Sequence, residues 1–130
     1  MVRDSAVRSR RGFTLIELLV VLAIVALLLS IAMPRYVKSL DTANETVLVE
    51  NLVRTREVID KYYADTGAYP ESLEELVEKK YLRALPYDPV ADSATNWVIV
   101  PPDPAYKGKV FNLRSAAPGT DRAGRRFAEL

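Results

Sequence analysis

The chain has 130 residues and a formal net charge of +1, so its length allows at most one small domain beside any membrane segment. It contains no cysteine, which excludes disulfides, thiol nucleophiles and thiolate metal sites. It also contains no histidine, the commonest general base and zinc ligand, so the composition argues against an enzyme. No basic face follows the first twelve residues, which argues against a nucleic-acid partner.

A continuous apolar run, Phe13 to Met33, follows a short basic segment, and Glu17 is the only charged residue within the run. A helix of this length rises roughly 30 Å, the thickness of the hydrocarbon core of a bilayer. Residues 1–12 carry a net charge of +3 and the rest of the chain −2, which predicts a cytoplasmic N-terminus and a translocated C-terminal part. A carboxylate inside a membrane span is costly and indicates a functional site with a partner.

Residues 10–17 read RRGFTLIE, and this order resembles the N-terminus of type IV prepilins and of the pseudopilins of type II secretion systems. The resemblance implies that a prepilin peptidase cleaves between Gly12 and Phe13 and N-methylates Phe13. It further implies that Glu17 neutralises the new amine, either within the chain, since positions i and i+4 share a helix face, or on a neighbouring subunit. A protonated or snorkelling Glu17 with no partner is the alternative.

Two ordinary targeting segments fit the N-terminus less well. A secretory signal has an apolar region of roughly 7–15 residues with a small residue after it, whereas here the run is longer and Gly12 precedes it. A plain signal anchor fits the length but gives no reason for Glu17 or for the glycine–phenylalanine junction.

The span is followed by an amphipathic segment, residues 35–66, which predicts one long helix from Phe13 to Thr66 with Gly67 as its stop. Pro34 removes a backbone donor and predicts a kink, or alternatively the end of the transmembrane helix. A mostly apolar stripe steps by three or four along the second half and is expected to pack on residues 67–130: Val37, Leu40, Asn44, Leu48, Leu52, Thr55, Ile59, Tyr62 and Tyr63.

The remaining residues predict a short helix and a small antiparallel sheet. Ser72 with Glu75 three residues later forms a capping box, and the acidic residues around it are interpreted as a solvated helix face. Residues 85–89 predict an extended turn, residues 97–100 and 110–114 two strands, and residues 126–128 a third edge strand. The expected fold class is α+β and pilin-like, with a long kinked N-terminal helix packed on the short helix and the sheet.

We therefore expect a cleaved leader at 1–12, a transmembrane half of the long helix at 13–33, an amphipathic half at 34–66 and a periplasmic α+β part at 67–130. The tyrosine, leucine and proline pattern of residues 69–89 resembles the region after the long helix in major pseudopilins. This resemblance, with the missing cysteines, favours a pseudopilin over a type IV pilin.

Major pseudopilins commonly bind calcium in the C-terminal loop, and the matching segment here is residues 115–124. Calcium takes six to eight oxygen ligands, usually with several carboxylates, whereas Asp121 is the only acid in this segment. Three nearby arginines would repel a cation: Arg122, Arg125 and Arg126. We expect no cofactor, and an ion pair from Asp121 to one of these arginines is a hypothesis for closing the loop. The tail from Ala116 to Leu130 is alternatively flexible.

The resemblance implies a structural subunit of the bacterial inner membrane that polymerises into a periplasmic filament for protein secretion. Its implied partners are copies of itself, other pseudopilins, the prepilin peptidase and the inner-membrane secretion platform. The alternatives are a type IV pilin or minor pilin for adhesion, motility or DNA uptake, and a membrane-anchored periplasmic binding module. Against the anchored module, the sequence shows no recognisable catalytic pair among its acidic, serine, lysine and tyrosine residues.

Overall fold

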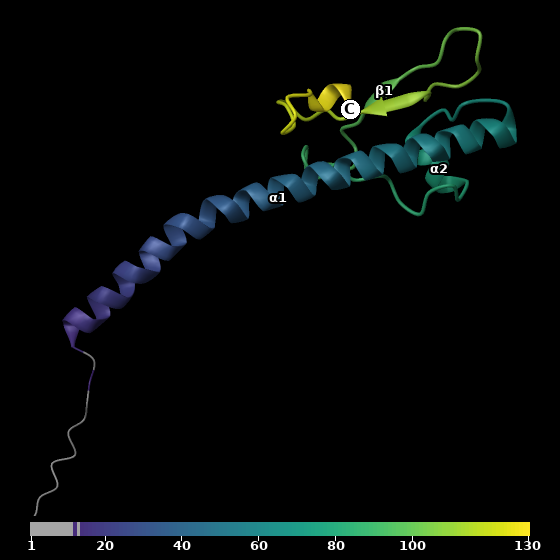
Figure 1. Ribbon diagram of the computed structural model, residues 1–130. Coiled ribbons are helices and arrows are strands. Elements are labelled where there is room, and N and C mark those ends of the chain that lie inside the picture. Colours follow the sequence, from purple (N-terminus) through teal and green to yellow (C-terminus); the bar gives the residue numbers. More distant parts are fainter. Residues whose placement is uncertain (1–11, 13) are drawn as a thin grey trace, which may run out of the picture. The chain divides into compact units, whose positions relative to one another are not determined.

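The computed structural model of the protein describes Gly12 and residues 14–130, which form two helices, two strands and a 3-10 helix (Figure 1). The chain divides into two compact units, residues 1–38 and residues 39–130. The expected α+β class, with a long helix, a short helix and a small antiparallel sheet, is confirmed.

Helix α1 (Leu15–Thr66) begins in the apolar run and continues through Pro34. The interpretation that Pro34 ends the helix is therefore wrong. Proline has no amide hydrogen, so the carbonyl of Ser30 lacks its usual helical donor there. The hydroxyl of Ser30 bonds one turn earlier, to the carbonyl of Ala26 at 2.8 Å. The kink at Pro34 stays a prediction.

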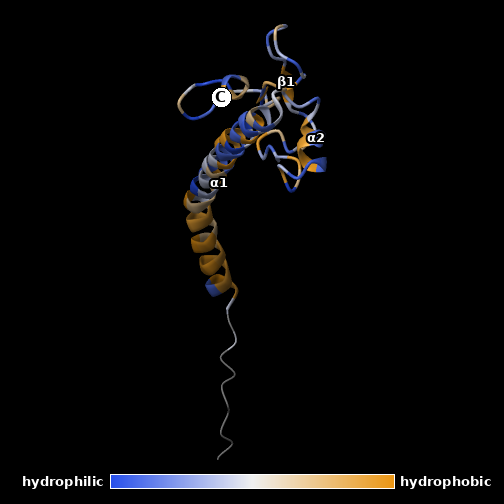
Figure 2. Ribbon diagram, turned by 90° about the vertical axis from the view of Figure 1, so that its right-hand side faces the viewer, coloured by the Kyte–Doolittle hydropathy of each residue, from blue (hydrophilic) through white to orange (hydrophobic). Residues whose placement is uncertain are grey.

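In the first unit the aliphatic side chains of α1 point outward all round the helix. Every large hydrophobic residue from Leu15 to Met33 is at least 45% exposed. Figure 2 shows this part of α1 as mostly hydrophobic, with a hydrophilic patch near its beginning. By length and composition, α1 contains a segment able to cross a membrane.

In the second unit one face of α1 forms one side of the hydrophobic core. Five of its residues are buried: Leu48, Leu52, Thr55, Ile59 and Tyr62. They step by three or four, so the predicted stripe is confirmed from Leu48 onward. The stripe is wrong at its beginning in this unit, because Leu40 is 46% exposed, Asn44 is exposed, and neither belongs to the hydrophobic core of the described residues. Val37 lies in the first unit and is 51% exposed.

Helix α2 (Leu73–Glu78) covers this face with Leu73 and Leu76. The predicted cap is confirmed, since the Ser72 hydroxyl accepts a hydrogen bond from the Glu75 amide at 3.2 Å. The Glu75 carboxylate bonds the amide of Glu71 at 2.7 Å, one residue before the usual return partner of a capping box. The bond to Ser72 satisfies one of the amides that a helix start leaves unpaired, and the bond from Glu71 holds the residue before the cap.

Strands β1 (Val98–Val100) and β2 (Asn112–Arg114) pair antiparallel with Ile99 opposite Leu113. The predicted third strand is wrong, because the 3-10 helix η1 (Phe127–Glu129) occupies that segment. Phe127 turns its ring into the core and is 7% exposed, which an edge strand at this position would not require. Ala117 is also buried, so the tail contacts the core at Ala117 and Phe127, while its flexible alternative stays a prediction.

Candidate functional site

The first candidate site is the beginning of α1. The hydroxyl of Thr14 accepts a hydrogen bond from the amide of Glu17 at 3.2 Å, and Glu17 Oε2 accepts one from the amide of Thr14 at 3.3 Å. This reciprocal pair is a capping box. Sequence reasoning found the same pattern at Ser72 but missed it here, although a threonine three residues before a glutamate is the same signal.

The capping box fixes where the carboxylate lies. Glu17 is exposed in the first turn of α1, and the neighbouring Leu15 and Ile16 are 81% and 69% exposed. Its Oε1 atom accepts no hydrogen bond from any described residue, so it has room for a second donor. A carboxylate at a helix start is also favoured by the positive end of the helix dipole. The site therefore presents one carboxyl group beside an apolar surface.

Of the two residues at the expected cleavage point, the structure describes only Gly12. Gly12 is exposed, and nothing lies within 4 Å of the position that a Cβ would occupy there. Phe13, the expected methylation site, and the leader before Gly12 lie outside the described residues. The cleavage and methylation sites stay predictions.

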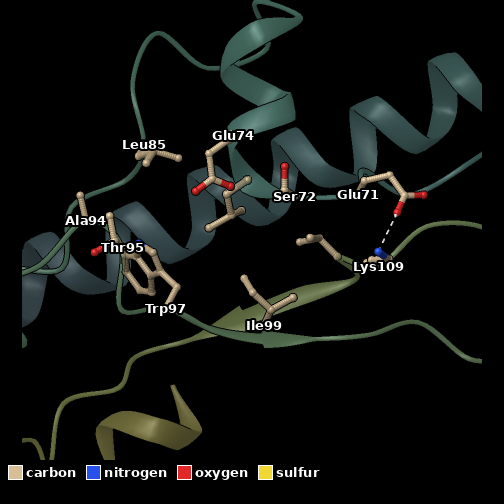
Figure 3. Close-up of a pocket in the computed structure, with 11 residues that line it drawn as sticks. Glu71, Ser72, Glu74, Leu85, Ala94, Thr95, Trp97, Ile99 and Lys109 are labelled. Carbon is tan, nitrogen blue, oxygen red and sulfur yellow. Dashed lines mark ion pairs between the residues drawn. The ribbon is translucent and has the colours of Figure 1, made fainter.

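A second candidate is a cleft of about 260 Å³ between α2 and β1 (Figure 3). Its apolar side chains include Trp97 and Ile99, and an ion pair between Glu71 and Lys109, 3.7 Å apart, lies at one end. The hydroxyl of Ser72 is occupied as the cap of α2. Histidine and cysteine, the commonest catalytic base and the most reactive nucleophile, are absent from the chain and so from this cleft. We assign it no chemistry.

A buried polar pair lies under the turn at residues 85–93. Asp88 is 2% exposed, and its Oδ2 accepts a hydrogen bond from the fully buried Ser115 hydroxyl at 2.5 Å. Its Oδ1 accepts bonds from the amides of Val90 and Ala91 at 2.9 and 3.0 Å. The sequence predicts the local turn, but it contains no signal for a partner twenty-seven positions away.

The expected weak metal candidate, Asp121, lies in the loop before η1. Within residues 14–130 no three acidic side chains gather closely enough to hold a metal ion. Its carboxylate pairs with the guanidinium of Arg125.

Comparisons with known proteins agree with these features. Residues 7–33 match the model of the prokaryotic N-terminal methylation motif. The chain is 30% identical to type II secretion system core protein G of Escherichia coli, over 87% of this chain and 85% of that protein. It is 29% identical to the protein of the same name from Klebsiella michiganensis, over 88% and 90%, and 34% identical to that of Pseudomonas aeruginosa, over 63% and 69%. No solved structure gives a significant match.

Proposed function

Since this chain belongs to the type II secretion system core protein G family, we propose that it is a pseudopilin, a structural subunit that polymerises into a periplasmic filament of a protein secretion system. The relatives that support this assignment are named for secretion rather than for surface pili. We therefore prefer a role in protein secretion to one in adhesion, motility or DNA uptake.

The observation that carries the proposal is the exposed apolar half of α1 with one carboxylate at its start. Aliphatic side chains cover every side of the helix from Leu15 to Met33. Lipid covers such a surface before assembly, and the same helices of other subunits cover it in a filament. Both environments are apolar, so transfer between them costs little hydrophobic free energy.

Glu17 favours the transfer of the helix from lipid into the filament. Peptidase cleavage after Gly12 creates a cationic amine on Phe13, and the free Oε1 of Glu17 is available to such a donor. A carboxylate and an amine neutralise one another in an apolar medium, whereas either alone is costly there. When the amine comes from a neighbouring subunit, the pair fixes the register of the two helices. The subunit then catalyses nothing, and its chemistry is assembly.

The basic leader sets the orientation of the chain in the membrane. Cleavage occurs on the cytoplasmic side of the inner membrane, where the basic leader stays, and residues 67–130 lie in the periplasm. The partners are further copies of this chain, other pseudopilins, the prepilin peptidase and the inner-membrane platform.

The capping box allows a sharp test of the role of the charge. Glu17→Gln keeps a side chain able to cap Thr14 and removes the charge, whereas Glu17→Ala removes both. We expect both variants to be processed and to insert in the membrane, with filament yield at least tenfold lower in each, because one lost charge pair in an apolar medium exceeds 1.4 kcal/mol. Glu50→Gln, an exposed charge on the same helix, is the matched control and should assemble normally.

The assay co-expresses each variant with the peptidase and the other secretion components in a host without its own core protein G. Gels and N-terminal sequencing measure processing, and cross-linking with electron microscopy measures filaments. Normal filament yield from Glu17→Gln with loss in Glu17→Ala would show that helix capping, not charge, is what assembly requires. Mature protein that retains residues 1–12 would contradict the proposed amine altogether.

A further inference from the structure

The C-terminal loop is the segment in which the resemblance to major pseudopilins implies calcium. A calcium site needs six to eight oxygen atoms, with carboxylates free to turn toward the ion. Residues 115–124 contain one carboxylate, Asp121, and the serine that the resemblance retains, Ser115. Whether a cation fits depends on what already occupies these oxygen atoms.

The carboxylate of Asp121 accepts three hydrogen bonds and makes one further close contact with a guanidinium nitrogen. Its Oδ1 accepts the amides of Ala123 and Arg125 at 2.9 and 2.8 Å. Its Oδ2 accepts Nε of Arg125 at 3.0 Å and lies 2.9 Å from Nη2 of the same guanidinium. The side chain is only 6% exposed. Two carboxylate oxygens offer about four acceptor positions. Hydrogen bonds take three of them, and the cationic guanidinium of Arg125 lies against Oδ2 and would repel a metal ion there.

Ser115 is occupied as well. Its hydroxyl donates to Asp88 Oδ2 and accepts the amide of Ala117 at 3.1 Å, and the residue is fully buried. On α1, Glu45 pairs with Arg122 of the loop at 3.5 Å. The carboxylates of Asp121, Asp88 and Glu45 are therefore each already in contact with a donor of the protein.

The charge balance points the same way. Burial acts to raise the pKa of Asp121, but the hydrogen bonds from Arg125 and Ala123 outweigh it, and the pKa lies below its usual value. The carboxylate is thus held as an anion by a guanidinium. A guanidinium forms a planar two-pronged contact that a hydrated surface cation does not reproduce.

We propose that the guanidinium of Arg125 takes the place of the calcium ion in this chain, so that its C-terminal loop closes without a divalent cation. The closed loop is continuous with the core: Asp121 donates its amide to the carbonyl of Arg125 at 2.7 Å, and Phe127 donates to that of Gly119 at 3.2 Å. Closure therefore seats the buried ring of Phe127. The inference does not depend on the proposed function, because it concerns the loop of a single subunit.

The test uses the full mature chain, monomeric in detergent micelles, after exhaustive treatment with EGTA. Thermal unfolding is followed by the fluorescence of Trp97, the only tryptophan, which is buried in the core. We expect calcium at millimolar concentration to shift the melting temperature by less than about 1 °C. A ligand at a hundred times its dissociation constant would instead raise it by on the order of 10 °C.

Local closure is measured by limited trypsin digestion, since the loop carries its own arginine sites. Arg125→Gln removes the guanidinium that contacts Asp121. We expect trypsin cleavage at Arg122 to accelerate roughly tenfold or more, because a charge-assisted pair is lost. Arg126→Gln is the matched control. It removes the same charge from the same loop, and the Arg126 side chain makes no ion pair with a described residue.

The outcomes separate the two accounts. Equal cleavage of the wild-type loop in calcium and in EGTA, with faster cleavage in Arg125→Gln alone, supports the proposal. Calcium that raises the wild-type melting temperature by several degrees, or protects the wild-type loop from trypsin, overturns it. Equal acceleration in both arginine variants also overturns it, because net charge rather than the contact of Arg125 with Asp121 would then control the loop. If Arg125→Gln fails to fold, the wild-type calcium comparison still decides.

Discussion

Of the described glycines, Gly108 is the one where the structure leaves least room for a side chain. A Cβ there would lie 2.1 Å from the carbonyl oxygen of Tyr69 and 2.6 Å from its carbonyl carbon, and the backbone has φ +106°. The loop before β2 rests with its backbone directly on the residues that follow α1. We therefore predict that Gly108→Ala strongly destabilises the second unit.

The magnitude follows from the hydrogen bonds around that contact. Three join the loop to Tyr69 and Pro70: Tyr69 amide to Lys107 carbonyl at 2.8 Å, and the amides of Lys109 and Val110 to the Pro70 carbonyl at 3.1 and 2.9 Å. Relief of the clash needs a shift of about 1 Å, which lengthens these bonds beyond bonding distance. At about 1 kcal/mol each, with about 1–2 kcal/mol of backbone strain, the cost is roughly 4–5 kcal/mol.

Gly67→Ala is the matched control. Gly67 also has a positive φ, +75°, but nothing lies within 4 Å of the added Cβ, so only the strain of about 1 kcal/mol remains. Urea unfolding of the full mature chain in detergent, followed by Trp97 fluorescence, measures both variants. A small domain has only about 5–15 kcal/mol in total, so the difference is easily seen. Equal destabilisation of the two variants would refute the close-approach argument.

Two further predictions concern the core and its edge. Leu52→Ala, at a site 1% exposed, should cost about 2–5 kcal/mol in the same urea assay, whereas Val53→Ala, at a site 47% exposed, should stay within about 0.5 kcal/mol. The hydroxyl of Tyr62, the amide of Glu71 and the ammonium of Lys79 lower the pKa of Glu75 to about 2. Because the pKa of Glu75 in the folded protein lies below the usual 4.5, the stabilisation from its ionised form is complete above pH 4.5 and is lost as pH falls toward 2. Glu75→Gln should therefore weaken the loss of stability at acidic pH. An unchanged acidic part of the stability–pH curve would contradict the assignment.

The helices were predictable because their signals are local and periodic. The spacing of Leu48, Leu52 and Ile59 alone places one face of α1 in the core, and Ser72 with Glu75 marks the start of α2. The beginning of the stripe failed for the converse reason. A periodic pattern shows which side chains share a face, but it does not show how far along the helix the rest of the fold extends.

The tail and the turn were beyond local reasoning. Residues 126–128 are too short a segment for periodicity to distinguish a strand from a 3-10 helix, and the burial of Phe127 decided between them. The bond between Ser115 and Asp88 depends on two loops meeting, which no spacing encodes. At the functional site the error was different: Glu17 was interpreted through its charge alone, so its local bond to Thr14 was missed.

The polar ties of the second unit explain how a small part without disulfides holds one conformation. Arg56 on α1 donates to Asn112 Oδ1 at 2.7 Å and to the carbonyls of Leu113 and Leu130 at 3.1 and 2.5 Å. Burial, and then the charge of Arg114, lower the pKa of Arg56, so its carbonyl acceptors must offset a cost that water would otherwise relieve.

Such ties add little net stability while formed, but they are expensive to break, because each leaves a partly buried donor or acceptor without a partner. The apolar core alone tolerates small rearrangements, whereas a satisfied polar tie excludes them. A subunit that repeats the same contact along a polymer needs one surface geometry in every copy. The hydrogen bonds of Arg56 and Asp88 hold the strands and the turn to α1 or to one another, and thereby supply that single geometry without a disulfide.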